Sequence, residues 1–381
     1  MRLANYVAPA SGGLRTALAE LGAGYLAAGH EPVLVVPGAR PDRRQSRQGL
    51  VITVPGVPVP GTGGYRAITA RRSLRRLLEE LQPDRLEVSD RTTLRWTGAW
   101  ARRCGIRSMM VSHDSLAALA QMFRPPGVSV RQLVDRLNRN TAASFDVVVC
   151  TTAWAAAEFR RLGVPNLAQV PLGVDLSSFH PGRFDESLRS QLAPGDQRLV
   201  VHCSRLSPEK RPERAIGAVA ELRRRGVCAV LVVAGDGPLR RSLEASAARL
   251  PVTFLGHVTD RGSLARLLAT ADVVIAPGPA ETFGLSALEA LASGTPVVVS
   301  RQSALPEVVG RAGLAAEDND AACADAVEQL LRRDATDRRG LARQQAERFG
   351  WPTAVNGFLG AHRLTPLPRG GEGTPAVRVG T

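Results

Sequence analysis

The feature that most constrains the fold is an alternation of short β-branched runs with longer helical patterns, which occurs twice along the chain. In the first half, strands are predicted at 33–36, 51–54, 85–88, 108–112 and 147–150, and helices at 14–28 and 70–81. In the second half, strands are predicted at 199–203, 230–233, 252–255, 273–276 and 297–299, and helices at 211–225, 240–249, 263–269, 285–292 and 321–332. This alternation predicts an α/β protein with two doubly wound, parallel-sheet domains.

A stretch rich in Pro, Gly, Ser and Asp separates the two alternations and predicts an interdomain linker at 176–197. The N-terminal domain is then 1–175 and the C-terminal domain 198–350, followed by a helix at 351–363. Residues 364–381 are rich in Gly, Pro and Thr and are predicted to be a disordered tail. Two domains of this kind place the carboxyl ends of their strands opposite each other across a cleft, where ligands bind.

The net charge is +14, and it is concentrated in the first domain, where the first 175 residues hold 23 Arg against 13 Asp and Glu. Such a domain is attracted to phosphates of a nucleic acid, an acidic membrane or an anionic ligand, and a solvated Arg-rich surface is an equal alternative. The five cysteines are odd in number and form no close pair, which indicates a reduced cytoplasmic protein without disulfides or structural zinc. No apolar run is long enough to span a bilayer.

Lys210 is the only lysine among 49 basic residues. An ammonium is a compact point charge, so a single Lys in an Arg-rich chain indicates a site that a wide guanidinium does not fit. Lys210 and Arg205 lie in the turn after the first strand of the second domain, where both can reach one diphosphate and stabilise charge on a leaving group. The alternative is ordinary surface charge.

The segment 272–300 carries two carboxylates, Glu281 in a strand-to-helix loop and Glu289 in the helix that follows. Carboxylates are good acceptors for vicinal sugar hydroxyls. Gly284 lets the amides of Phe283 and Leu285 approach a ligand. The alternative is that Glu281 is solvated and Glu289 forms a helix salt bridge.

Three further positions lie at predicted ligand edges of the sheets. Gly12 and Gly13 open the helix 14–28, whose N-terminus favours an anion. Gly235 follows the strand 230–233 in a turn that can lie near a nucleotide, and His113 follows the strand 108–112 and can hydrogen-bond a sugar hydroxyl. The alternative is that the glycines serve ordinary turns and that His113 is a loop histidine whose hydrogen bonds are satisfied within the protein.

Two segments have competing interpretations. Asp318-Asn319-Asp320 imitates an Asp-x-Asp metal motif, but it precedes a helix where Asp is a natural N-cap, so no metal site is predicted.

The helix 70–81 has four arginines beside an apolar face, which is typical of a helix on an acidic membrane or of a surface helix packed on its own sheet. The arginines are Arg71, Arg72, Arg75 and Arg76.

The order of these features resembles glycosyltransferase family 4 over nearly the whole chain to about residue 360. The resemblance implies a GT-B fold, in which two Rossmann-like domains face each other across a cleft, and transfer with retention of anomeric configuration. It implies the catalytic residues His113, Arg205, Lys210 and Glu281. It implies the donor-binding residues Gly12, Gly13, Arg205, Lys210, Gly235, Glu281, Phe283, Gly284, Leu285 and Glu289.

The resemblance also assigns roles within that set. Arg205 and Lys210 hold the diphosphate, Glu281 and the backbone of 283–285 hold the sugar, and Glu289 holds the ribose. Gly12 and Gly13 approach the phosphates or the sugar, while His113 lies over the sugar near its reacting carbon. No cofactor is required, and a divalent cation is at most non-essential.

A narrower resemblance, to the actinobacterial phosphatidylinositol dimannoside mannosyltransferases, is carried by the segments 11–16, 63–67, 86–91, 170–179 and 276–281. It implies GDP-mannose as donor, an anionic inositol glycolipid as acceptor, and addition of a third, α-1,6-linked mannose. The expected location is the cytoplasm, in peripheral contact with the acidic inner face of the cell membrane.

Three alternatives to that function stay open. The first is another hexosyltransferase that uses a UDP-sugar or a soluble acceptor, since no residue distinguishes guanine from uracil. A nucleic-acid binder is disfavoured because aromatic residues are missing from the Arg clusters and no binding module is present. A catalytically inactive sugar-nucleotide sensor is disfavoured by the intact Arg205, Lys210, Glu281 and Glu289.

Overall fold

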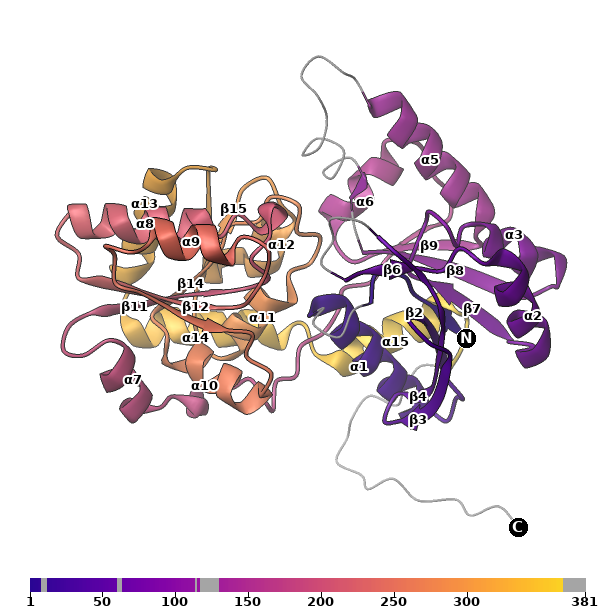
Figure 1. The fold of residues 1–381 in the computed structure, drawn as a ribbon, viewed down its shortest axis with the longest axis horizontal. Helices are drawn as coiled ribbons and strands as arrows, with labels where there is room; N and C mark the ends of the chain where they lie inside the picture. Colours follow the sequence, from indigo (N-terminus) through magenta and orange to yellow (C-terminus); the bar gives the residue numbers. More distant parts are fainter. Residues whose placement is uncertain (8–11, 60–63, 114, 117–129, 366–381) are drawn as a thin grey trace, which may run out of the picture.

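The protein folds into two α/β domains (Figure 1). The structure is a computed structural model that describes residues 1–7, 12–59, 64–113, 115–116 and 130–365. Each domain is built on a sheet whose neighbouring strands are parallel, apart from one edge strand of the first domain. These sheets confirm the predicted doubly wound architecture.

The sheet of the first domain has the strand order β10-β9-β8-β7-β1-β2-β4-β3. Its strands are β1 (Arg2–Leu3), β2 (Val33–Gly38), β3 (Asp42–Ser46), β4 (Gly49–Pro55), β7 (Arg85–Val88), β8 (Arg107–Ser112), β9 (Val147–Cys150) and β10 (Leu167–Gln169). The short strands β5 (Val57–Pro58) and β6 (Arg66–Ala67) pair separately. The described helices of this domain are α1 (Gly13–Ala27), α2 (Arg71–Leu81), α3 (Trp96–Arg103), α5 (Arg131–Ser144) and α6 (Ala153–Arg160).

Side chains alternate between the two faces of this sheet, and both faces are covered. Met110 and Val148 point into the core under α2, α3, α5 and α6, whereas Met109 and Val149 point into the core on the side of α1. Because a strand in such a sheet is buried on both faces, it appears in the sequence as a continuous apolar run. The pattern therefore missed β3, an exposed edge strand of sequence DRRQS, and the two-residue β1.

The sheet of the second domain has the order β13-β12-β11-β14-β15-β16. Its strands are β11 (Arg198–Cys203), β12 (Ala229–Ala234), β13 (Val252–Gly256), β14 (Val273–Ala276), β15 (Val297–Ser300) and β16 (Gly313–Ala316). Helices α8 (Glu213–Arg224), α9 (Arg240–Ser246) and α13 (Asp320–Leu331) cover one face. The other face is covered by α10 (Arg261–Thr270), α11 (Leu285–Ala292) and α14 (Ala335–Glu347) (Figure 1). The short helix α12 (Leu305–Val309) packs into the same core as these three helices.

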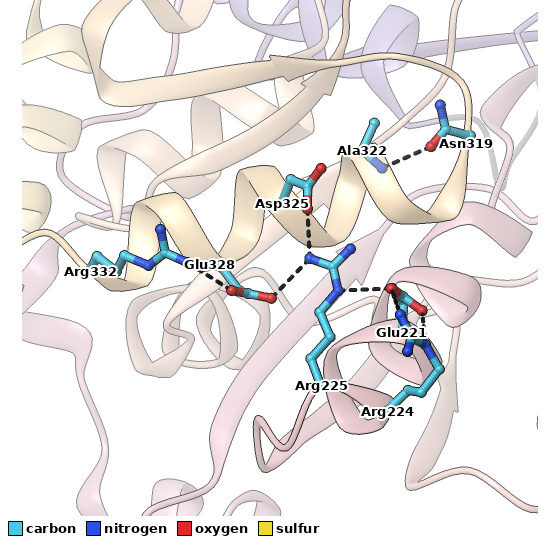
Figure 2. Close-up of polar contacts among 8 residues, drawn as sticks. All are labelled: Glu221, Arg224, Arg225, Asn319, Ala322, Asp325, Glu328 and Arg332. Atoms are coloured by element: carbon cyan, nitrogen blue, oxygen red, sulfur yellow. Dashed lines mark hydrogen bonds and ion pairs between the residues drawn. The ribbon is translucent and has the colours of Figure 1, made fainter.

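An ion-pair network joins α8 to α13 on the surface of the second domain (Figure 2). Arg225 donates to Glu221 at 2.8 Å, to Asp325 at 2.6 Å and to Glu328 at 3.0 Å. One guanidinium thus links two helices that pack side by side. Because these groups are solvent-accessible, water screens each pair, and the network adds little to the stability of the packing.

The predicted linker 176–197 contains local structure that belongs to the second domain. It holds the 3-10 turn η1 (Pro181–Arg183) and the helix α7 (Glu186–Leu192). Asp185 caps α7, and Arg189 forms an ion pair with Asp272 at 2.8 Å. Because this segment is rich in Pro, Gly and Ser, its short, capped helix was not predicted from the sequence.

The C-terminal helix α15 (Trp351–Ala361) returns to the first domain and lies beside α1 (Figure 1). Gly24 of α1 lies so close to Val355 that an added Cβ would be 2.3 Å from its Cγ2. Arg107 donates to the carbonyl of Ala361 at 3.1 and 3.2 Å. The predicted helix 351–363 is present, but its sequence does not show which domain it joins. Most of the predicted tail, from residue 366 on, lies outside the described residues.

Candidate active site

The N-termini of α1 and α11 face each other where the two domains meet. A Cβ added to Gly13 would lie 3.8 Å from Cδ1 of Leu285. Gly12 is the N-cap of α1, and no atom of the described residues lies within 4 Å of a Cβ built there. Both helix N-termini present positive dipole ends to the same interdomain space, which suits an anion such as a diphosphate.

Lys210 and Glu281 form an ion pair at this place. Lys210 ends the 3-10 turn η2 (Pro208–Lys210), and Glu281 lies in the loop after β14. Gly278 lets that loop pack on η2, because a Cβ there would be 3.0 Å from the carbonyl oxygen of Glu209. The Lys210 and Glu281 side chains keep 27% and 19% exposure, so a ligand can reach both. The sequence placed them at one site but did not predict that they pair.

Arg205 stacks on an aromatic ring from the other domain. Its guanidinium carbon lies 5.0 Å from the ring centroid of Tyr65, and Tyr65 packs edge-to-face on Tyr6 with centroids 6.4 Å apart. The geometry is that of a cation–π contact between the domains. Neither tyrosine was predicted from the sequence as a site residue, since Tyr6 belongs to no motif and Tyr65 lies in a segment, 63–67, that carries a resemblance but no ligand-binding pattern.

Glu289 lies within α11, and burial raises the pKa of its carboxyl to about 7. Arg261 opposes this pKa shift and Asp175 adds to it. No described residue forms an ion pair or a side-chain hydrogen bond with this carboxylate, so the alternative of a helix salt bridge finds no support in the described part of the chain. A half-buried acceptor of this kind suits a hydroxyl-bearing ligand.

Gly284 adopts a left-handed backbone with φ of 71°, and an added Cβ would lie 2.2 Å from Cδ2 of Leu305. Glycine is therefore required for the turn that starts α11. The side chains of Phe283 and Leu285 are buried, and Phe283 packs edge-to-face on Phe349 at 5.9 Å. Only the backbone of these two residues is therefore available to a ligand.

Gly235 lets two turns at the end of the sheet come together. A Cβ added there would lie 1.8 Å from the carbonyl oxygen of Ser204, so any side chain would push away the turn that carries Arg205. This packing role is sufficient to require glycine. Contact of Gly235 with a nucleotide stays a prediction.

His113 follows β8 and lies at the domain interface. Its Nε2 is 3.1 Å from Oγ of Ser89, and its carbonyl oxygen accepts a hydrogen bond from the hydroxyl of Thr282 in the Glu281 loop. His113 is thus a neighbour of the Glu281 loop, although its imidazole also has a hydrogen-bond partner in its own domain.

His202, at the end of β11, was not singled out from the sequence. Burial lowers its pKa to about 4, so it is neutral. The ring lies 2.9 Å from the carbonyl of Ile275 through Nδ1 and 3.0 Å from the Ser204 hydroxyl through Nε2. With a carbonyl acceptor on Nδ1, this nitrogen carries the proton, and His202 fixes the start of the turn that leads to Arg205.

The Asp318-Asn319-Asp320 segment is a helix cap with ion pairs. The capping residue is Asn319, which accepts from the amide of Ala322 at 2.8 Å (Figure 2), so the expectation that an Asp caps this helix was wrong. Asp318 and Asp320 instead pair with Arg214 at 2.7 and 3.0 Å. Among the described residues, no three His, Cys, Asp or Glu side chains form a group that could hold a metal ion.

Helix α2 uses its apolar face within its own domain. Leu74, Leu77 and Leu78 are buried in the core, and the four arginines Arg71, Arg72, Arg75 and Arg76 are exposed. The helix is therefore packed on its sheet, and only its charged face is open. None of the described helices has the length and apolar character needed to cross a membrane.

Two family models match the chain, one in each domain. Residues 197–333 match the family model of glycosyl transferases group 1, and residues 12–173 match a glycosyl transferase 4-like domain. The chain is 49% identical over 361 residues, 94% of each chain, to the GDP-mannose-dependent alpha-(1-6)-phosphatidylinositol dimannoside mannosyltransferase of Mycobacterium tuberculosis.

Two further relatives are more distant. A GDP-mannose-dependent alpha-mannosyltransferase of Mycolicibacterium smegmatis is 28% identical over 351 residues, 87% of this chain and 88% of that protein. Among solved structures, the sucrose-phosphate synthase of Thermosynechococcus elongatus superposes with a TM-score of 0.77 at 21% identity, over 95% of this chain and 98% of that one. This superposition shows the GT-B fold.

Proposed function

Because the chain belongs to the group 1 glycosyltransferases, we propose that it transfers mannose from GDP-mannose to a phosphatidylinositol mannoside, forming an α-1,6 linkage. The observation that carries this proposal is the 49% identity with the mycobacterial mannosyltransferase over 94% of both chains. The Lys210–Glu281 ion pair, in which Glu281 belongs to the loop that leads into α11, also supports it.

The donor lies along this site in an order set by the chemistry of each group. Glu289 accepts hydrogen bonds from ribose hydroxyls, and Arg205 and Lys210 bind the diphosphate. Glu281 accepts from hydroxyls of the sugar. Lys210 and Glu281 form an ion pair, so a donor whose diphosphate binds Lys210 has its sugar beside Glu281.

Retention follows from displacement on one face of the sugar. The bond between the anomeric carbon and the phosphate oxygen breaks, and the bond to the acceptor oxygen forms on the same face. The acceptor hydroxyl gives its proton to the departing diphosphate. Arg205 and Lys210 stabilise the charge that grows on this leaving group, and His113 hydrogen-bonds the mannose. These two cations supply the charge for which other transferases use a divalent metal, so no metal is strictly required.

The acceptor is a lipid, so the protein works at an acidic membrane surface on the cytoplasmic side. The exposed arginines of α2 support this, since α2 keeps its leucines inside the domain and offers charge alone. Arg75 is partly neutralised by Glu79 at 2.8 Å, so the surface contact is moderate and reversible.

The test is a radiolabelled-donor assay with mannosylated inositol lipids, with and without a chelator. The expected result is α-linked transfer from GDP-mannose that survives chelation. Transfer from a UDP-sugar instead of GDP-mannose would reject the donor, and a β-linked product in NMR spectra would reject retention. Loss of all activity in chelator would reject the metal-free mechanism.

A further inference from the structure

One residue of the second domain, Thr282, is held by the first domain at both its side chain and its carbonyl. Its hydroxyl donates to the carbonyl oxygen of His113. Its own carbonyl oxygen accepts from the hydroxyl of Thr152 at 2.9 Å and from that of Thr151 at 3.4 Å. Thr282 is 8% exposed, so these hydrogen bonds lie largely out of water and are costly to break.

Further hydrogen bonds hold the first-domain residues of this contact in place. Thr152 caps α6 by accepting from the amide of Ala155 at 3.1 Å, so its hydroxyl acts as donor to Thr282 and acceptor from α6. Glu307 of the second domain accepts from the amides of Ala153 and Trp154 at 2.9 and 3.2 Å. The N-terminal amides of α6 are therefore satisfied partly by its own domain and partly by the opposite one.

The second-domain side is equally constrained. Glu281 precedes Thr282, and its carbonyl oxygen accepts from the amide of Ala304 within the second domain at 2.9 Å. The backbone of the loop is thus fixed to its own domain at residue 281 and to the other domain at residue 282. Any change in the position of Thr282 relative to His113 changes how Glu281 and His113 face a bound sugar.

We propose that Thr282 is a positioning residue that sets His113 against Glu281 across the domain interface. It does not touch the reacting atoms. It acts by holding the backbone of His113 to the loop that carries the sugar-binding carboxylate, so that the two halves of the sugar site have one relative position. The inference rests on the proposed function only in taking Glu281 and His113 as sugar contacts.

The test compares three variants in steady-state turnover. Thr282→Val keeps the shape and removes the hydroxyl, and we expect kcat to fall about tenfold to a hundredfold with KM for the donor little changed, since misplacing a catalytic contact acts on the transition state. Thr282→Ser keeps the hydroxyl and should restore most of kcat. Thr295→Val is the matched control, because the Thr295 hydroxyl donates at 2.6 Å to the Leu268 carbonyl, buried within a single domain.

A double variant separates a positioning role of Thr282 from a general effect on the stability of the protein. In a His113→Ala enzyme, Thr282→Val should lower kcat by less than about twofold further, because both changes remove one shared contribution. Wild-type kcat in Thr282→Val, equal losses of kcat in Thr282→Val and Thr295→Val, or full additivity with His113→Ala would each overturn the proposal.

The donor for these assays is the nucleotide sugar that most stabilises the wild-type protein in a thermal-shift panel. If that donor is not GDP-mannose, the mannose proposal fails, and the variant series still tests Thr282 with the donor found. Unchanged kcat in Thr282→Val with a working donor counts against the positioning role alone.

Discussion

Raising the pH through 7 is expected to tighten binding of the nucleotide sugar, because Glu289, the proposed acceptor for ribose hydroxyls, must be ionised to act as a full acceptor. Burial raises the pKa of this carboxyl to about 7 from an ordinary value of 4.5. At a pH below this pKa, a proton competes with the ligand for the Glu289 carboxylate. At a pH above it, the carboxylate is ionised and can accept hydrogen bonds from the ligand. Affinity therefore rises with pH up to about 7 and then levels off.

The size of the effect follows from the ionised fraction. With a pKa of about 7, roughly one tenth of Glu289 is ionised at pH 6 and roughly nine tenths at pH 8. Apparent affinity scales with the binding-competent fraction, so Kd at pH 6 should be about tenfold higher than at pH 8. Binding near pH 6 should also release close to one proton, since the bound carboxylate is held ionised.

The assay is isothermal titration calorimetry of GDP-mannose at pH 6, 7 and 8, in buffers of different ionisation enthalpy. The nucleotide sugar is preferred to GDP, because a terminal phosphate itself titrates near pH 6 and would obscure the protein's proton. Glu289→Gln is the matched control: it should bind more weakly at pH 8 and show nearly the same Kd at all three values. A wild-type Kd that is flat across this range, or an equal slope in Glu289→Gln, would refute the assignment of this titration to Glu289.

Further outcomes follow from the same site and from α2. Lys210→Ala should lower kcat by about a hundredfold while weakening GDP binding much less, because its largest effect comes as charge grows on the leaving group; unchanged turnover would reject the role. Glu281→Ala should abolish transfer and leave GDP binding nearly unchanged in calorimetry. Weaker GDP binding with transfer retained would show that Glu281 has the role assigned to Glu289. Replacing the four α2 arginines by Ser should weaken binding to anionic vesicles by about 1 kcal/mol per residue near the surface. That binding should fall as salt rises, because charges are screened within about 8–10 Å near physiological ionic strength; equal binding to neutral vesicles would contradict it.

The position of Glu281 in a strand-to-helix loop was predicted from the chain, while the surroundings of that loop were not. Gly284 was expected to let backbone amides approach a ligand, and the structure shows that its φ is 71°, a value that glycine adopts easily. The same segment gave no sign that Thr282 would bond to His113, which lies 169 residues earlier. A local pattern reports local conformation, and a contact between domains depends on how two separately folded surfaces meet.

The two doubly wound domains could be predicted from the chain alone, because strands buried on both faces must be continuous apolar runs and the helices between them must carry an apolar stripe. Lys210 and Glu281 could be assigned to ligand edges in the same way, since strand ends in parallel sheets gather at one side. The contact of Arg205 with Tyr65 and the return of α15 to the first domain could be seen only in the folded molecule. These arrangements depend on the packing of surfaces far apart in the chain, which leaves no periodicity or spacing in the sequence to reveal them.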